Sequence, residues 1–299
     1  MSPSRVAGRL PAAARPHAPD RRGTRALRSL RRPAGRPQPH ETVWLFDLDN
    51  TLHDCSRHIF QAIDGAMSDA MMRWLNLDRA RADTLRLEYW RRYGATAIGL
   101  ERHHGIAATD FLEACHDFDV THMVHAERGL AHKLGRLPGR KILLTNAPLS
   151  YARRVLHVLG ILQEFEGLWS IDHMRLQGRL KTKPSVAMMR QLLAQLHVPA
   201  RQVVLVDDTL ANLRSARQVG MRTVLSHHPG TPHNARHHGR SPYVDIRVKS
   251  VGELTTRAVS HRKPGIPGHG HNAQSAIACS GRLRTAGGPP GARPCPPAA

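Results

Sequence analysis

Residues 43–52 read VWLFDLDNTL: four apolar residues lead into two carboxylates, Asp47 and Asp49. A short apolar run without polar alternation is typical of a strand buried in a parallel sheet. Open α/β sheets bind their ligands beyond the carboxyl ends of such strands, so both carboxylates are expected at a ligand site. Two like charges that close together need a cation or a shared proton.

Three later segments repeat this apolar form, and stretches with helical spacing lie between them. The apolar segments are residues 141–145 (KILLT), 202–206 (QVVLV) and 222–225 (RTVL), and the helical stretches are residues 148–159, 184–196 and 210–219. Pro148 and Pro184 stand at the first turn of two helices, and Gly160 and Gly220 follow two of them, as helix start and stop signals do. Strands that alternate with helices predict an α/β fold with a doubly wound, Rossmann-like parallel sheet.

The segment after the first strand has a different character. Apolar side chains recur at helical spacing from Ile59 to Trp74, and a second stripe includes Leu85, Tyr89 and Tyr93. We therefore predict an all-helical cap over residues 57–132, inserted into a core formed by residues 41–56 and 133–228. Aromatic residues 89, 90 and 93 could stack on a base, but stripes at this spacing more often pack between helices, and that is our expectation.

The formal net charge of +21 lies mostly at the two ends of the chain. Residues 1–40 contain ten arginines and one acid, and residues 229–299 contain ten lysines or arginines and two acids. Both segments are rich in Arg, Pro, Ala and Gly, which cannot bury a core. We expect a disordered basic tail at residues 1–40 and a low-complexity basic tail at residues 229–299. Contact of these tails with nucleic acid is a less favoured alternative.

Cysteine content and hydropathy narrow the class of protein further. The four cysteines are widely scattered, which argues against a disulfide scaffold or a zinc ribbon. No apolar run approaches the roughly 18–20 residues that cross a bilayer. The arginine pairs near the N-terminus are not followed by the apolar stretch of about 7–15 residues that a secretory signal contains, so we do not expect one. We expect a cytoplasmic protein without a membrane partner.

Polar residues follow the second and third predicted strands as well. Thr145 and Asn146 lead into a helix, Lys183 precedes the next helix, and Asp207 and Asp208 end the third strand. A hydroxyl and free N–H groups at a helix N-terminus suit a phosphate, and the lysine could neutralise a phosphate or a carboxylate. All of these residues should project from one edge of the sheet, where hard oxygen ligands favour Mg²⁺.

This set of motifs resembles the haloacid dehalogenase superfamily of phosphotransferases. The matching motifs are DLDNT at 47–51, LLTN at 143–146, Lys183 followed by proline, and VDD at 206–208. Within the superfamily, Tyr93-Gly94 and the sequences TNAPLSYARRVLHVLGI and DDTLANLRSARQVGM are similar to the pyrimidine 5′-nucleotidase branch. His53 stands where that branch often has an aromatic residue.

The resemblance implies a role for each acid. Asp47 would attack phosphorus and form an aspartyl-phosphate, and Asp49 would act as the general acid and then the general base. Mg²⁺ would bind to Asp47, to the backbone carbonyl of Asp49 and to Asp208, with Asp207 as the alternative ligand.

The resemblance also implies how phosphate is held and what is hydrolysed. Thr145 and the backbone of Asn146 would bind phosphate oxygens, and Lys183 would balance their charge. The implied activity is that of a Mg²⁺-dependent phosphomonoesterase for UMP and CMP. A phosphatase for another small ester, such as phosphoglycolate, FMN or a sugar phosphate, stays open as the alternative, with a basic-tailed nucleic-acid-binding protein ranked below it.

Overall fold

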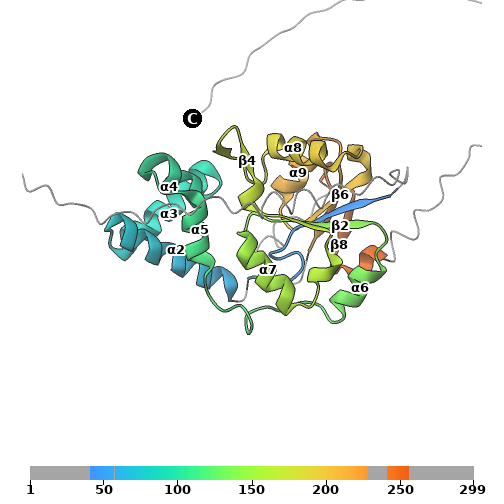
Figure 1. Ribbon diagram of the computed structural model, residues 1–299, viewed down its shortest axis with the longest axis horizontal. Coiled ribbons are helices and arrows are strands. Elements are labelled where there is room, and N and C mark those ends of the chain that lie inside the picture. The colour runs from blue at the N-terminus through green and yellow to red at the C-terminus, as the bar shows by residue number, and fades with distance from the viewer. Residues whose placement is uncertain (1–40, 57, 228–240, 256–299) are drawn as a thin grey trace, which may run out of the picture. The chain divides into compact units, whose positions relative to one another are not determined.

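The computed structural model describes residues 41–56, 58–227 and 241–255. Its main sheet has six strands, all parallel, in the order β3-β2-β1-β6-β7-β8 (Figure 1). The strands are β1 Val43–Phe46, β2 Arg140–Leu144, β3 Gly167–Trp169, β6 Val203–Asp207, β7 Arg222–Ser226 and β8 Ile246–Val248, and the antiparallel pair β4 Arg175–Leu176 and β5 Arg179–Leu180 stands apart from them. The helices are α2 Ile59–Leu75, α3 Arg79–Tyr93, α4 Thr96–His104, α5 Ala108–His116, α6 Leu130–Arg136, α7 Leu149–Val158, α8 Val186–Leu196 and α9 Leu210–Gln218.

Both faces of the sheet are buried, which explains the continuous apolar runs. Leu45 and Leu205 face the side covered by α8 and α9, while Phe46 and Val206 face the side covered by α6 and α7 (Figure 1). Strand side chains alternate between faces, so a strand covered on both sides must be apolar at every position. The structure confirms the predicted α/β class with its parallel sheet.

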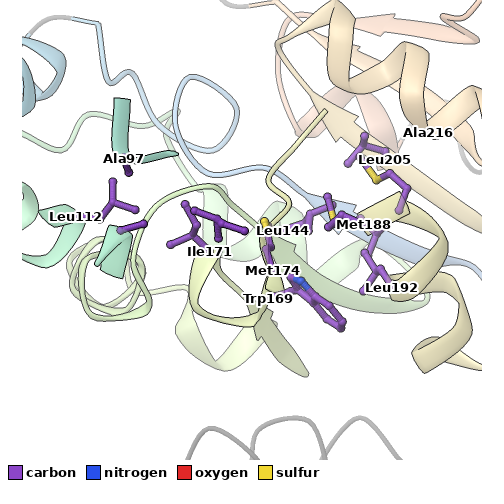
Figure 2. Packing of buried hydrophobic residues seen from close by; sticks show 14 of the residues in the cluster. Ala97, Leu112, Leu144, Trp169, Ile171, Met174, Met188, Leu192, Leu205 and Ala216 are labelled. Atoms are coloured by element: carbon purple, nitrogen blue, oxygen red, sulfur yellow. The ribbon is translucent and has the colours of Figure 1, made fainter. Parts of the chain in front are cut away.

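The four helices α2–α5 lie between β1 and β2 in the chain and confirm the predicted helical insertion. Their apolar stripes pack against one another, and a Cβ at Gly99 of α4 would come within 2.2 Å of the Tyr89 ring on α3. The apolar cluster continues from Leu205 through Ile171 to Leu112 of the insertion (Figure 2). The insertion therefore shares part of its packing with the core.

The structure differs from the sequence prediction at several boundaries. The sheet has two strands that were not predicted, β3 and β8, each only three residues long. Strand β8 falls in the range 229–299 predicted as a tail, and Val248, Val251 and Leu254 are buried there, so the core continues past residue 228. Helix α6 begins within the predicted insertion but packs with β1 and α7.

A smaller difference concerns the helix after Lys183. Helix α8 begins at Val186 with Ser185 as its N-cap, so Pro184 precedes the helix, and the Lys183–Pro184 peptide bond is cis. The predictions for residues 1–40 and for most of 229–299 lie outside the described residues. No helix in the described ranges is long and apolar enough to cross a membrane.

Candidate active site

The carboxyl ends of β1 and β6 lie side by side where the strand order changes direction. Strand β1 pairs with β2 on one side and with β6 on the other. The backbone N–H of Asp47 donates a hydrogen bond of 2.9 Å to the carbonyl of Val206, which extends this pairing to the end of the strand. Open α/β sheets bind ligands in the crevice at such a point. The fold therefore brings Asp47 together with Asp207 and Asp208.

Lys183 is buried between two of these carboxylates. Its Nζ donates hydrogen bonds of 2.6 Å to Asp47 Oδ1 and 2.9 Å to Asp207 Oδ2. Burial lowers the pKa of Lys183, but the two carboxylates outweigh burial and leave its pKa above the usual value. The ammonium group is therefore charged, as a buried cation with two anionic partners should be.

Asn146 holds the backbone of Lys183 in place. Its Oδ1 accepts a hydrogen bond of 2.9 Å from the Lys183 N–H, and its Nδ2 donates one of 3.1 Å to the Lys183 carbonyl. This pair of bonds ties the end of β2 to the loop before α8. The Asn146 side chain thus positions the segment that carries Lys183, and a contact of the Asn146 backbone with phosphate stays a prediction.

Asp207 and Asp208 differ in how their oxygens are used. Asp207 is fully buried and accepts hydrogen bonds from Lys183, from the Thr209 N–H and from Asn212 Nδ2. Asp208 accepts one side-chain hydrogen bond, from Thr209 Oγ1, and lines the cavity described below. A carboxylate whose lone pairs are already occupied is a poor direct ligand, so the geometry favours Asp208 as the ligand of a cation.

The three acids at this edge lie close enough to repel one another, and Lys183 binds two of them, Asp47 and Asp207. One oxygen each of Asp47, Asp207 and Asp208 lies within 4.8 Å of the others. Burial, and then the neighbouring carboxylate of Asp207, raises the pKa of Asp208 to about 7. Burial also raises the pKa of Asp47 well above its usual value, against the opposing effect of Lys183. Clustered hard oxygens with raised pKa values fit a divalent cation such as Mg²⁺, which would be held by Asp47 and Asp208.

Asp49 lies in a hydrogen-bonded group of its own. Its Oδ1 accepts a hydrogen bond of 2.9 Å from the Tyr151 hydroxyl and lies 3.0 Å from His53 Nε2. Burial raises the pKa of Asp49, but His53 and Tyr151 together outweigh burial, and the pKa is lowered. Asp49 is therefore held in one orientation and is a carboxylate at neutral pH.

A cavity of about 510 Å³ joins these groups to the helical insertion. From the core it is lined by all six residues predicted as site residues, namely Asp47, Asp49, Thr145, Asn146, Lys183 and Asp208. The Thr145 Oγ1 accepts a hydrogen bond of 3.0 Å from the Ala147 N–H, so its own proton remains available for an anion. Helices α2–α5 supply most of the opposite lining.

Sequence reasoning did not find every residue at this site. Tyr151 comes from α7, 102 positions after Asp49, and nothing in its helical pattern marks it as a partner. In the sequence, His53 stood out only because the pyrimidine 5′-nucleotidase branch often has an aromatic residue at that position. Its i, i+4 spacing from Asp49 is nevertheless compatible with a contact. Asn212, in the first turn of α9, donates from Nδ2 to both carboxylate oxygens of Asp207.

Comparisons with known proteins agree with this architecture. The model of haloacid dehalogenase-like hydrolases matches residues 42–220. Phosphate metabolism protein 8 of Saccharomyces cerevisiae is 25% identical over 202 residues, which cover 63% of this chain and 62% of the yeast protein. The matched region thus spans less than two thirds of that relative.

Two solved structures share the fold. The HAD phosphatase from Thermococcus onnurineus has a TM-score of 0.51 at 19% identity and covers 73% of this chain and 97% of its own. CbbY from Rhodobacter sphaeroides, in complex with phosphate, has a TM-score of 0.51 at 20% identity and covers 72% of this chain and 96% of its own. The family model spans the sheet up to the end of α9, the whole insertion and the six predicted site residues, and this chain belongs to the haloacid dehalogenase-like hydrolases.

Proposed function

We propose that this protein is a Mg²⁺-dependent phosphomonoesterase whose preferred substrates are pyrimidine nucleoside 5′-monophosphates, UMP and CMP. One observation carries the proposal of phosphoryl transfer. The Asp47 carboxylate is held by the buried Lys183 ammonium in a cavity that also contains a second acid, Asp49. A nucleophile, a cation beside it and an acid–base group are the parts that hydrolysis of a phosphate ester requires.

In the first step, an oxygen of Asp47 forms a bond to phosphorus while the bond from phosphorus to the ester oxygen breaks. Asp49 gives the departing oxygen a proton. Because the pKa of Asp49 is lowered, it must first acquire that proton, which comes from solvent in the cavity that Asp49 lines. In the second step Asp49 takes a proton from the water that hydrolyses the aspartyl-phosphate.

The remaining residues bind and orient. Lys183 and the Thr145 hydroxyl face the charge that develops on the phosphoryl oxygens, and their positions are set before substrate arrives. When bound, Mg²⁺ would supply charge neutralisation between the carboxylates and the phosphate. The pyrimidine preference is supported by the motif resemblance, and a cavity of about 510 Å³ is within the range of small-molecule sites.

Phosphate release from a panel of esters tests the proposal on the full chain. The panel contains UMP, CMP, AMP, phosphoglycolate, FMN and ribose 5-phosphate, each with Mg²⁺ and with EDTA. We expect EDTA to abolish release and UMP and CMP to give the highest kcat/KM. Mg²⁺-dependent release that prefers another ester would replace the nucleotide assignment, and no release from any ester would overturn the activity itself.

The affinity for Mg²⁺ should rise with pH. Asp208 must lose its proton to bind the cation, and its pKa of about 7 lies between the two conditions compared. We expect binding to be about tenfold weaker at pH 6 than at pH 8, by isothermal titration calorimetry, because one proton is released on binding. In the Asp208→Asn variant, the affinity for Mg²⁺ should be weaker at both pH values and should no longer rise between pH 6 and pH 8. An unchanged affinity in that variant would remove Asp208 from the ligand set.

A further inference from the structure

Exposed apolar side chains gather at the catalytic cavity. Among the described residues, five large apolar side chains are exposed: Phe60, Trp74, Leu87, Trp90 and Val158. Three of them, Phe60 on α2 and Leu87 and Trp90 on α3, line the cavity that contains the catalytic carboxylates. Exposed apolar surface in the same cavity as charged groups indicates a ligand with an apolar face.

Trp90 differs from the two other aromatic residues of its helix. Tyr89 is buried against Gly99 and its hydroxyl lies 2.8 Å from His104 Nε2. Tyr93 packs on His103, with two arginine side chains over its ring. Trp90 is 58% exposed and has no aromatic or cationic partner among the described residues. The expectation that these aromatic residues pack between helices thus holds for Tyr89, whereas the indole of Trp90 is exposed to the cavity.

Polar groups accompany this apolar surface. Arg86 lines the cavity and donates a hydrogen bond of 2.6 Å from Nη1 to Asp64 Oδ1. The remaining N–H groups of its guanidinium take no part in this bond. His116 also lines the cavity, and its Nδ1 lies 2.7 Å from the Leu112 carbonyl. A carbonyl only accepts, so Nδ1 carries the proton. Burial lowers the pKa of His116 and leaves Nε2 as an acceptor.

We propose that Trp90 is the specificity-determining residue for the leaving group and stacks on a planar heteroaromatic ring joined to the phosphorylated sugar. This proposal rests on the proposed phosphomonoesterase function and extends it to the part of the substrate remote from phosphorus. An exposed indole presents a flat apolar face, and the donors and acceptor beside it suit the polar edge of a nucleobase or the hydroxyls of its sugar.

The test compares two substrates that differ only in the ring. UMP carries a base, and ribose 5-phosphate carries the same sugar and phosphate without one. In Trp90→Ala, the ratio of kcat/KM for UMP to kcat/KM for ribose 5-phosphate should fall about tenfold or more, as expected for loss of one stacked base. The change should lie mainly in KM, and Trp90→Phe should recover most of it.

Trp74→Ala is the matched control. Trp74 is another exposed tryptophan of the insertion, 41% exposed, but it packs edge-on against Phe111 at 6.0 Å and does not line the cavity. Its substitution should leave the ratio unchanged. A ratio in Trp90→Ala equal to that of the wild type, or equal to that of Trp74→Ala, overturns the assignment of Trp90.

A binding measurement separates this proposal from the proposed function. Titration of Asp47→Asn and of Asp47→Asn/Trp90→Ala with UMP, by calorimetry, gives Kd without turnover. Weaker binding of UMP in the double variant supports the Trp90 subsite, even if the wild type hydrolyses no ester. Absence of hydrolysis would overturn the proposed phosphomonoesterase activity but not the Trp90 subsite. Equal binding overturns the subsite and leaves hydrolysis untouched.

Discussion

The Asp47→Asn variant should lose phosphomonoesterase activity, with kcat lower by about 10⁴-fold or more. An amide oxygen can still accept the hydrogen bond that Lys183 Nζ makes to Asp47 Oδ1, but it does not attack phosphorus. The substitution also removes a buried carboxylate whose pKa is raised by burial and by the neighbouring charges of Asp207 and Asp208. The fold should therefore persist, with a melting temperature equal to or above that of the wild type.

Asp54→Asn is the control for loss of a nearby carboxylate, because Asp54 follows the same strand but does not line the cavity. Its activity should match the wild type. Initial rates of phosphate release and thermal unfolding curves on all three proteins make the comparison. Activity of Asp47→Asn within tenfold of the wild type, at normal thermal stability, would exclude Asp47 as the nucleophile.

Lys183→Met should have the second largest effect, because it acts on both stability and activity. It leaves the carboxylates of Asp47 and Asp207 buried without their shared cation. Removal of one partner from a buried ion pair costs about 3–5 kcal/mol, and phosphate release should fall to near background. Measurement is by chemical denaturation at pH 8 with parallel rate assays.

The loss of folding stability in Lys183→Met should depend on pH in a defined direction. Without the ammonium group, the carboxyl of Asp47, whose pKa burial already raises, holds its proton more tightly in the folded state than in the unfolded one. The folded state then binds more protons above about pH 4, so the variant loses stability as pH rises and recovers it as pH falls toward 5. Lys183→Met/Asp207→Asn should regain part of the loss at pH 8. A single variant as stable as the wild type at pH 8 would show that the pair is not a net contributor to folding.

The sequence predicted those features that depend on local pattern and on strand ends. The apolar runs predicted β1, β2, β6 and β7, and the rule that parallel strands meet at one edge placed Asp47 and Asp208 together. Strands β3 and β8 were not predicted because three residues are too few to show a pattern, and β8 has an arginine at its centre.

Features that depend on distant packing were beyond the sequence. The hydrogen bond from Tyr151 to Asp49 joins two elements that only the tertiary fold brings together. Asp207 and Asp208 are equivalent by pattern, and the hydrogen bonds from Asn212 and Lys183 to Asp207 separate them. Helical periodicity also cannot tell whether a face meets another helix or a cavity, which is why Trp90 was grouped with Tyr89.

The division of the cavity between core and insertion has an evolutionary consequence. The groups proposed to act on phosphorus come from strand ends and their loops, whereas Phe60, Leu87 and Trp90 come from helices encoded by one continuous stretch of the chain. Substitutions confined to α2 and α3 can alter the lining that the insertion supplies while Asp47 and Lys183 keep their positions. Divergence of substrate range, in natural lineages or in a laboratory library over residues 59–93, can thus proceed without rebuilding the reaction.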